Sequence, residues 1–133
     1  MTLQDDAPAG FAALGLRDEV LRAVAETGYT SPTPIQAAAI PLVLARRDLI
    51  GVAQTGTGKT ASFVLPMLDV LASGRARARM PRSIILSPTR ELATQTAANF
   101  EIYGKHLSLT MALIIGGVGM AGQEKLLENG GDV

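Results

Sequence analysis

Apolar side chains recur at helical spacing near the start of the chain. The apolar positions from Leu16 to Val24 lie three to four residues apart, which predicts a helix over about 16–27. Gly28 follows as a suitable C-terminal cap, because glycine readily adopts positive φ. We predict four further helices, over about 34–46, 59–73, 90–104 and 120–129.

The second helix has a clear start signal. Thr33 can accept a hydrogen bond from a backbone N–H of the first turn, and Pro34 is well suited to the first helical position. Pro41 and Pro66 fall inside predicted helices, where each is expected to cause a bend or a displaced boundary.

Short apolar runs alternate with these helices. The segments 49–53, 83–87 and 109–115 are each short enough for a buried parallel strand, and 131–133 is expected to lead into another. Strands that alternate with helices predict an α/β fold with a mostly parallel sheet and helices on both faces. We expect a flexible leader over 1–10 and a partial domain over 11–133 that is truncated at its C-terminus.

Composition narrows the class of protein. The chain has 133 residues, of which 47% are hydrophobic and 18% charged, as expected for one soluble globular domain. Its longest apolar stretch, 37–45, is far below the roughly 18–20 residues that span a bilayer. We therefore expect a cytoplasmic protein with no membrane partner. With no cysteine and one histidine, the chain has no disulfide framework and no thiolate or histidine-rich metal site.

Overall charge does not identify a nucleic-acid binder. The formal net charge is zero, and the segments 1–66, 67–82 and 83–133 carry −1, +3 and −2. A nucleic-acid partner must therefore be inferred from particular residues.

A phosphate-binding loop is predicted between the strand at 49–53 and the helix that follows. Gly56 and Gly58 permit backbone conformations in which successive N–H groups point at phosphate oxygens. Lys59 can reach the β- and γ-phosphates, and the Thr60 hydroxyl is suitably placed to bind Mg²⁺. Ala53 stands where the general pattern has glycine. The alternative is an ordinary glycine-rich turn, which the sequence Gly-Lys-Thr disfavours.

Gln36 is a candidate for adenine recognition. A glutamine amide donates and accepts hydrogen bonds at once, which matches the N6 and N7 edge of adenine. Phe11 offers an aromatic ring that can stack on a base. A solvent-exposed polar residue is the alternative for Gln36 taken alone.

Together these features resemble the DEAD-box RNA helicases. Residues 28–36 resemble the Q motif, 53–60 motif I with its initial alanine, and 88–93 motif Ia (PTRELA), while Gly116-Gly117 matches the glycine doublet that follows. The order and spacing agree over about 11–117. The short leader is similar to that of bacterial members, among them the RhlE-like group.

The resemblance implies a RecA-like P-loop NTPase domain that uses ATP and Mg²⁺, with Thr60 as the metal-binding residue. Lys59 and Thr60 are implied in catalysis. Nucleotide contacts are implied for Phe11, Tyr29, Ser31, Thr33, Gln36, Gln54, Thr55, Gly56, Thr57, Gly58, Lys59 and Thr60. Contacts to the sugar-phosphate backbone of RNA are implied for Pro88, Thr89, Arg90, Gly116 and Gly117.

The family's Asp-Glu-Ala-Asp and Ser-Ala-Thr motifs do not occur in the chain. The resemblance therefore implies the N-terminal portion of an ATP-dependent RNA helicase, and we expect the isolated chain to be inactive and prone to non-native self-association. The alternatives are a nucleotide- or RNA-binding module without catalysis, a small-molecule kinase with a P-loop, and a DNA helicase.

Overall fold

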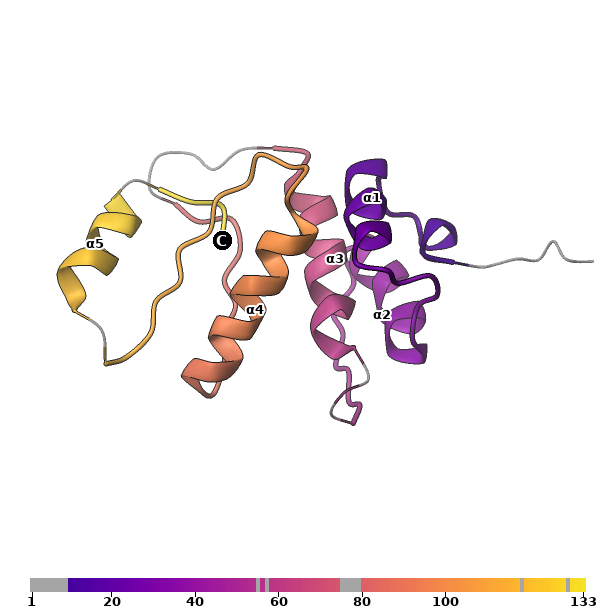
Figure 1. Ribbon diagram of the computed structural model, residues 1–133, viewed down its shortest axis with the longest axis horizontal. Helices are drawn as coiled ribbons and strands as arrows, with labels where there is room; N and C mark the ends of the chain where they lie inside the picture. The colour runs from indigo at the N-terminus through magenta and orange to yellow at the C-terminus, as the bar shows by residue number, and fades with distance from the viewer. Residues whose placement is uncertain (1–9, 55, 57, 75–79, 118, 129) are drawn as a thin grey trace, which may run out of the picture.

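The computed structural model describes residues 10–54, 56, 58–74, 80–117, 119–128 and 130–133 (Figure 1). Apart from Gly10, the predicted leader lies outside the described residues. The described residues form one 3₁₀ turn and five helices: η2 (Phe11–Leu14), α1 (Asp18–Glu26), α2 (Pro34–Leu44), α3 (Lys59–Leu71), α4 (Arg90–Tyr103) and α5 (Met120–Glu128).

The predicted helices are confirmed, and local capping explains where they begin and end. Thr33 and Gln36 form a capping box at the start of α2, in which each side chain accepts a hydrogen bond from the other residue's backbone N–H. Thr89 caps α4 by accepting from Leu92 N at 3.2 Å. Gly28, with φ of +90°, follows the end of α1 as expected.

Both internal prolines lie within continuous helices. Helix α2 passes Pro41 and ends at Leu44, and α3 passes Pro66 and ends at Leu71, so neither proline moves a boundary. An interior proline removes one helical hydrogen bond and costs about 3 kcal/mol. Burial offsets this cost, since Pro66 is fully buried.

The hydrophobic core lies where α3 packs between α2 and α4 (Figure 1). Helix α3 contributes the largest share, because its apolar residues occur on most of its circumference. The core consists of Phe11, Leu16, Val20, Val24, Ile40, Ala61, Val64, Leu65, Leu68, Phe100 and Tyr103.

The predicted strand segments are extended, but no run among the described residues is regular enough to be a β-strand. For 49–53 and 83–87 the prediction of burial was wrong: Ile50 is 92% exposed, Val52 89%, Ile84 76% and Leu86 86%. The segment 109–115 is mostly half-buried. A strand in a parallel sheet is buried by neighbouring strands and by helices on both faces. In the described part of the chain, these neighbours are present only in part.

Residues 131–133 provide the strand-like pairing between separate segments. Asp132 N donates to Thr110 O at 3.0 Å, and Ala112 N donates to Val133 O at 2.9 Å. On the other side, Ser83 N donates to Asp132 O at 3.1 Å. The C-terminal residues therefore lie between the segments that begin at 82 and 110. Three residues supply too few hydrogen bonds for a regular ladder.

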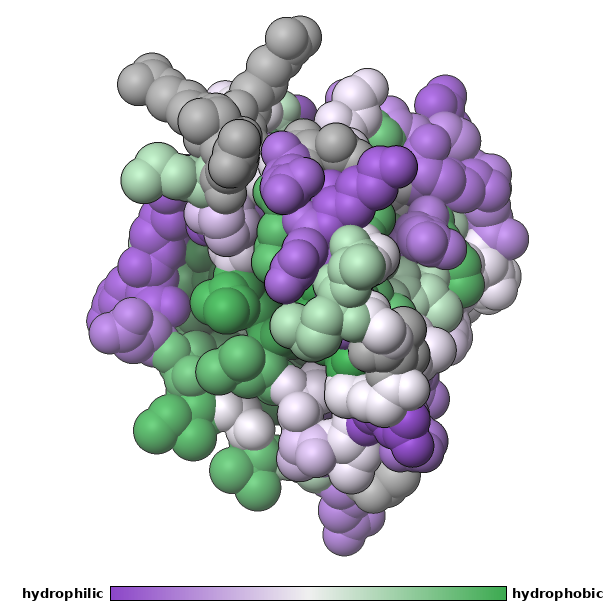
Figure 2. Space-filling model, turned by 90° about the vertical axis from the view of Figure 1, so that its left-hand side faces the viewer, coloured by the Kyte–Doolittle hydropathy of each residue, from purple (hydrophilic) through white to green (hydrophobic). Residues whose placement is uncertain are grey.

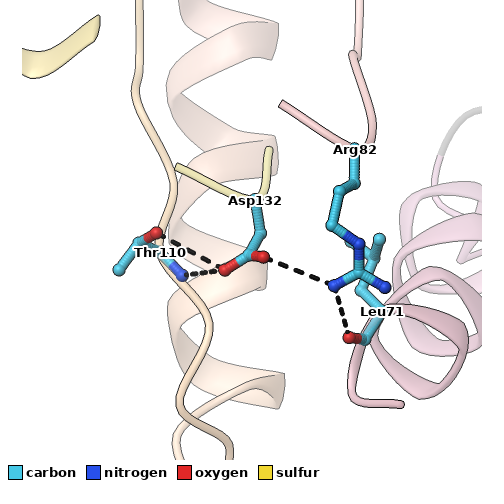
Figure 3. A network of polar contacts seen from close by, with 4 residues as sticks. All are labelled: Leu71, Arg82, Thr110 and Asp132. Carbon is cyan, nitrogen blue, oxygen red and sulfur yellow. Dashed lines mark hydrogen bonds and ion pairs between the residues drawn. The ribbon is translucent and has the colours of Figure 1, made fainter. Parts of the chain in front are cut away.

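A buried carboxylate fixes this arrangement (Figure 3). Asp132 is 6% exposed, and its Oδ2 accepts a hydrogen bond from Thr110 N at 3.1 Å. Its Oδ1 lies 3.4 Å from Nη1 of Arg82, which also donates to the Leu71 carbonyl at 2.8 Å. Asp132 thus connects the end of the chain to the end of α3.

Candidate nucleotide and RNA sites

The predicted phosphate loop ends at the first residue of α3. Gly56 and Gly58 both have φ of +83°, in the left-handed region that favours glycine. Lys59 is exposed and Thr60 half-buried at the N-terminus of α3, where the helix dipole favours an anion. Thr55 and Thr57 lie outside the described residues.

Gln36 is joined to this loop. Its side chain is 5% exposed, and its Nε2 donates to the carbonyl of Gly58 at 3.2 Å. Its Oε1 accepts from Thr33 N at 2.9 Å. Each amide atom retains capacity for one further hydrogen bond, because an amide nitrogen carries two hydrogens and its oxygen two lone pairs. Contact between these groups and a purine remains a prediction.

The other residues assigned to the base lie in different surroundings. Phe11 is 6% exposed and packs in the hydrophobic core, while Ser31 is exposed. Tyr29 is 56% exposed and lies beside Tyr103. Burial raises the pKa of Tyr103 above 10.0, and the neighbouring Tyr29 raises it further. Stacking of Phe11 or Tyr29 on a base remains a prediction.

The two segments assigned to RNA, 88–90 and 116–117, lie together, although 26 positions separate Arg90 from Gly116. Arg90 Nη1 donates to the carbonyl of Gly116 at 3.2 Å, so the guanidinium lies against the glycine doublet. Gly117 has φ of +80°, and a Cβ there would lie 2.6 Å from Arg90 Nη1. The positive φ therefore favours glycine at this turn, whereas a Cβ there would displace only the flexible end of the Arg90 side chain.

Sequence reasoning missed the residue that holds this turn in place. Gln123 of α5 is 5% exposed, and its Oε1 accepts a hydrogen bond from Ile115 N at 2.7 Å. In the sequence it is one polar residue in a predicted helix, and nothing there links it to the glycine doublet.

The two candidate sites lie at the same end of the molecule. Helices α3 and α4 both begin at the lower end in Figure 1, and the loop that contains 116–117 descends to the same end. In α/β folds this end, where the chain passes from strand to helix, is where ligands bind.

A cluster of charged side chains, separate from the two candidate sites, connects α1 to the segment after α4. Glu26 pairs with Lys105 at 2.7 Å and with His106. Hydrogen bonds from Lys105 and His106 lower the pKa of Glu26 to about 2. These contacts lie away from the phosphate loop and serve to fix the position of α1.

The described residues contain no cluster of three metal-binding side chains. The chemistry of the Thr60 hydroxyl nevertheless fits Mg²⁺, since this ion is commonly held by few protein oxygens together with water and the phosphates of a nucleotide. Within the described ranges, no helix is both long enough and apolar enough to cross a membrane.

The family model of the DEAD/DEAH box helicases matches residues 33–133, from the α2 cap to the C-terminus. The chain belongs to this family. The rrp3 ATP-dependent rRNA helicase of Aspergillus terreus is 50% identical over 117 residues, which make up 88% of this chain and 26% of that protein. DEAD-box ATP-dependent RNA helicase 29 of Oryza sativa subsp. indica is 49% identical over 121 residues, which make up 90% of this chain and 14% of that protein.

Solved structures of this family share the fold. A DEAD box protein from Methanococcus jannaschii superposes with a TM-score of 0.83 at 37% identity, covering 92% of this chain and 33% of that one. The RNA helicase Prp28 from Chaetomium thermophilum, bound to ADP, superposes with a TM-score of 0.85 at 41% identity, covering 94% of this chain and 31% of that one. The predicted RecA-like α/β fold class is therefore confirmed. The bacterial, RhlE-like assignment remains a prediction, because the relatives described here are eukaryotic and archaeal.

The chain spans about a quarter or less of the curated relatives' length and about a third of these solved chains. Family membership makes an unrelated P-loop kinase a poor alternative.

Proposed function

We propose that the chain binds ATP with Mg²⁺ and the sugar-phosphate backbone of RNA, as part of an ATP-dependent RNA helicase. The observation that carries this proposal is the hydrogen bond from Gln36 to the carbonyl of Gly58. It attaches the residue assigned to the purine directly to the loop assigned to the phosphates. The ADP bound by the relative Prp28 supports an adenine nucleotide.

In this proposal, the remaining hydrogen and lone pair of the Gln36 amide contact adenine, assisted by Ser31 and Thr33. The loop from Gln54 to Gly58 surrounds the phosphates, with backbone N–H groups as donors. Lys59 binds the β- and γ-phosphates, and the Thr60 hydroxyl is a ligand of Mg²⁺. When bound, the metal ion neutralises charge on the phosphates.

Isothermal titration calorimetry with a non-hydrolysable ATP analogue and Mg²⁺ tests the nucleotide site. We expect Lys59→Ala to weaken binding at least tenfold and Gln36→Ala to abolish a preference for ATP over GTP. Lys125→Ala, on the exposed face of α5, is the matched control and should bind as the unaltered chain does. Preference for GTP, or a harmless Lys59→Ala, would overturn the assignment.

RNA is proposed to bind along Pro88, Thr89 and Arg90 together with Gly116 and Gly117. The bond between Arg90 and Gly116 supports this, because it makes the two segments one surface. Arginine donates in a planar fork suited to phosphate, and such contacts position RNA without reading its sequence.

Fluorescence anisotropy with a single-stranded RNA tests this surface. Removal of one phosphate contact by Arg90→Ala should lower the salt slope of log K by about 0.7, whereas Arg22→Ala on exposed α1 should leave the slope unchanged. A DNA strand of the same sequence distinguishes an RNA helicase from a DNA helicase, because only RNA carries the 2′-hydroxyl. An equal effect of the two arginine variants would refute the RNA surface.

For this chain by itself, binding without catalysis is a second candidate. The Asp-Glu-Ala-Asp and Ser-Ala-Thr sequences are not present, and phosphoryl transfer depends on groups that position water and metal. We expect no ATP turnover with or without RNA. An RNA-stimulated phosphate release assay above background would contradict this expectation.

Self-association is proposed on separate grounds. Ile50 and Leu86 are 92% and 86% exposed, and exposed apolar surface favours association. Sedimentation velocity over a range of concentrations tests it, and a monomer at all concentrations would refute it.

A further inference from the structure

The turn at Gly116 and Gly117 is held by side chains from two different helices. Arg90 Nη1 of α4 donates to the carbonyl of Gly116 at 3.2 Å. Gln123 Oε1 of α5 accepts a hydrogen bond from Ile115 N at 2.7 Å. The two bonds act on adjacent residues, so together they fix the path of the backbone into the turn.

This turn carries backbone donors that the described contacts leave available. Gly116 and Gly117 are exposed, and within the described residues neither N–H group makes a backbone hydrogen bond. Gly117 also has φ of +80°, in the left-handed region that glycine readily adopts. Successive N–H groups in a turn can bind an anion such as a phosphate oxygen. Two exposed amides beside an arginine therefore suit the RNA backbone.

Gln123 is the buried residue of an otherwise exposed helix. It is 5% exposed, whereas every other residue of α5, from Met120 to Glu128, is exposed. A helix on a protein surface normally buries apolar side chains, and a buried amide is stable only where it makes hydrogen bonds. Burial of this glutamine therefore indicates a specific contact, and the bond to Ile115 N is that contact.

The apolar contacts of α5 lie at its other end. Leu126 and Leu127 line a hollow together with the extended segments 83–87 and 111–114, and Figure 2 shows the apolar side chains gathered on this face, seen from the side of α5. Apolar contact is not directional, so by itself it permits small shifts of a helix. A hydrogen bond depends on distance and angle, and it fixes one atom against another. Gln123 therefore determines how the start of α5 meets the chain before the glycine turn.

We propose that Gln123 is a positioning residue for RNA: by holding Ile115 N, it keeps the N–H groups of Gly116 and Gly117 where they can donate to a phosphate beside Arg90. The inference rests on the RNA surface proposed above, and it adds a residue that acts on RNA only through the turn. Ile115 belongs to this surface, because it lines an open hollow on α4 together with Arg90. A displacement of Ile115 therefore moves the turn relative to the arginine.

Fluorescence anisotropy with a single-stranded RNA tests the proposal on Gln123→Met. Methionine has a similar length but lacks the amide oxygen, so it removes the acceptor for Ile115 N. We expect RNA binding to weaken about three- to tenfold, which corresponds to one net hydrogen bond. Ala121→Met places the same side chain at an exposed position of α5 and is the matched control, with RNA affinity equal to that of the unaltered chain.

Two readouts separate positioning from a general effect on stability. Calorimetry with a non-hydrolysable ATP analogue should give the same affinity for Gln123→Met and the unaltered chain, because the bond of Gln123 lies at the glycine turn. A double-mutant cycle with Arg90→Ala should show coupling. In the Arg90→Ala background, Gln123→Met should weaken RNA binding at least twofold less than it does alone, because the arginine and the turn bind the same phosphate.

Amide hydrogen exchange on the unaltered chain, resolved by NMR, does not depend on how a variant folds. The amide of Ile115 should be protected with and without RNA, because Gln123 holds it in both states. The amides of Gly116 and Gly117 should exchange quickly in the free chain and at least tenfold more slowly when RNA is bound.

The outcomes separate this inference from the proposed function. If Arg90→Ala weakens RNA binding and Gln123→Met does not, the RNA surface stands and the positioning role fails. An equal loss of RNA and ATP-analogue affinity in Gln123→Met, a purely additive cycle, or rapid exchange of the Ile115 amide would also overturn the inference. If the unaltered chain does not bind RNA, the proposed function fails and the inference fails with it.

Discussion

The contact between Gln36 and Gly58 can be tested with Gly58→Ala, for which Gly56→Ala is the matched control. Both Gly56 and Gly58 have φ of +83°, so alanine at either position costs about 1–2 kcal/mol of backbone strain. The space around them differs. A Cβ at Gly56 has no neighbour within 4 Å, while a Cβ at Gly58 lies 2.3 Å from Gln36 Nε2 and 3.3 Å from Thr33 Oγ1.

The additional cost at Gly58 arises from lost hydrogen bonds. The amide of Gln36 is the end of a flexible side chain, so it can move away from a new Cβ. It then gives up its bond to the Gly58 carbonyl, about 0.5–1.5 kcal/mol. It also disturbs the capping box with Thr33, where a lost cap costs about 0.5–2 kcal/mol. Gly58→Ala should therefore destabilise the chain by about 1–3 kcal/mol more than Gly56→Ala.

Urea denaturation measures the free energy of unfolding of both variants, and the comparison holds when their m-values are equal. A double-mutant cycle then isolates the contact: in the Gln36→Ala background, Gly58→Ala should cost no more than Gly56→Ala. If Gly58→Ala costs the same in both backgrounds, the amide does not occupy the space beside the loop, and the reasoning fails.

Two further substitutions test the polar contacts of Glu26 and of Asp132. The pKa of Glu26, about 2, lies below its ordinary 4.5, so its carboxylate stabilises the fold above pH 4.5, and this contribution is lost as the pH falls toward 2. The stability difference between the unaltered chain and Glu26→Gln should therefore shrink over that range in urea titrations, and a constant difference would contradict the assignment. Asp132→Ala removes the buried carboxylate that accepts from Thr110 N and pairs with Arg82, and it should cost about 1–3 kcal/mol in the same assay. Glu128→Ala on exposed α5 should stay within about 0.5 kcal/mol, and equal effects of these two alanine variants would refute a structural role of Asp132.

Helix positions were predictable because their signals are local. Thr33 accepts a hydrogen bond from a residue three positions later, so a threonine followed by proline before a helical pattern indicates the start. The glycines of the phosphate loop are a similar case. Their positive φ is a property of one residue, and it can be predicted from the pattern in which that residue occurs.

Burial of the strand segments could not be predicted in the same way. The composition of 83–87 predicts an extended apolar chain, which the structure has. Whether Ile84 and Leu86 are covered depends on which other segments lie beside them, and both are exposed. Sequence reasoning also treated Gln123 as one polar residue of a helix, although its side chain accepts a hydrogen bond from Ile115, eight positions earlier.

The sequence by itself determined the elements whose hydrogen bonds close within a few residues, and it located the motifs of the family. Tertiary structure decided which distant groups meet: Gln36 with Gly58 across 22 positions, Arg90 with Gly116 across 26, and Arg82 with Asp132 across 50. Such contacts depend on the path of the whole chain, because the packing of the helices determines which distant segments lie side by side. The sequence therefore contains the two sites as separate motifs, and only the fold brings the residues of each site together.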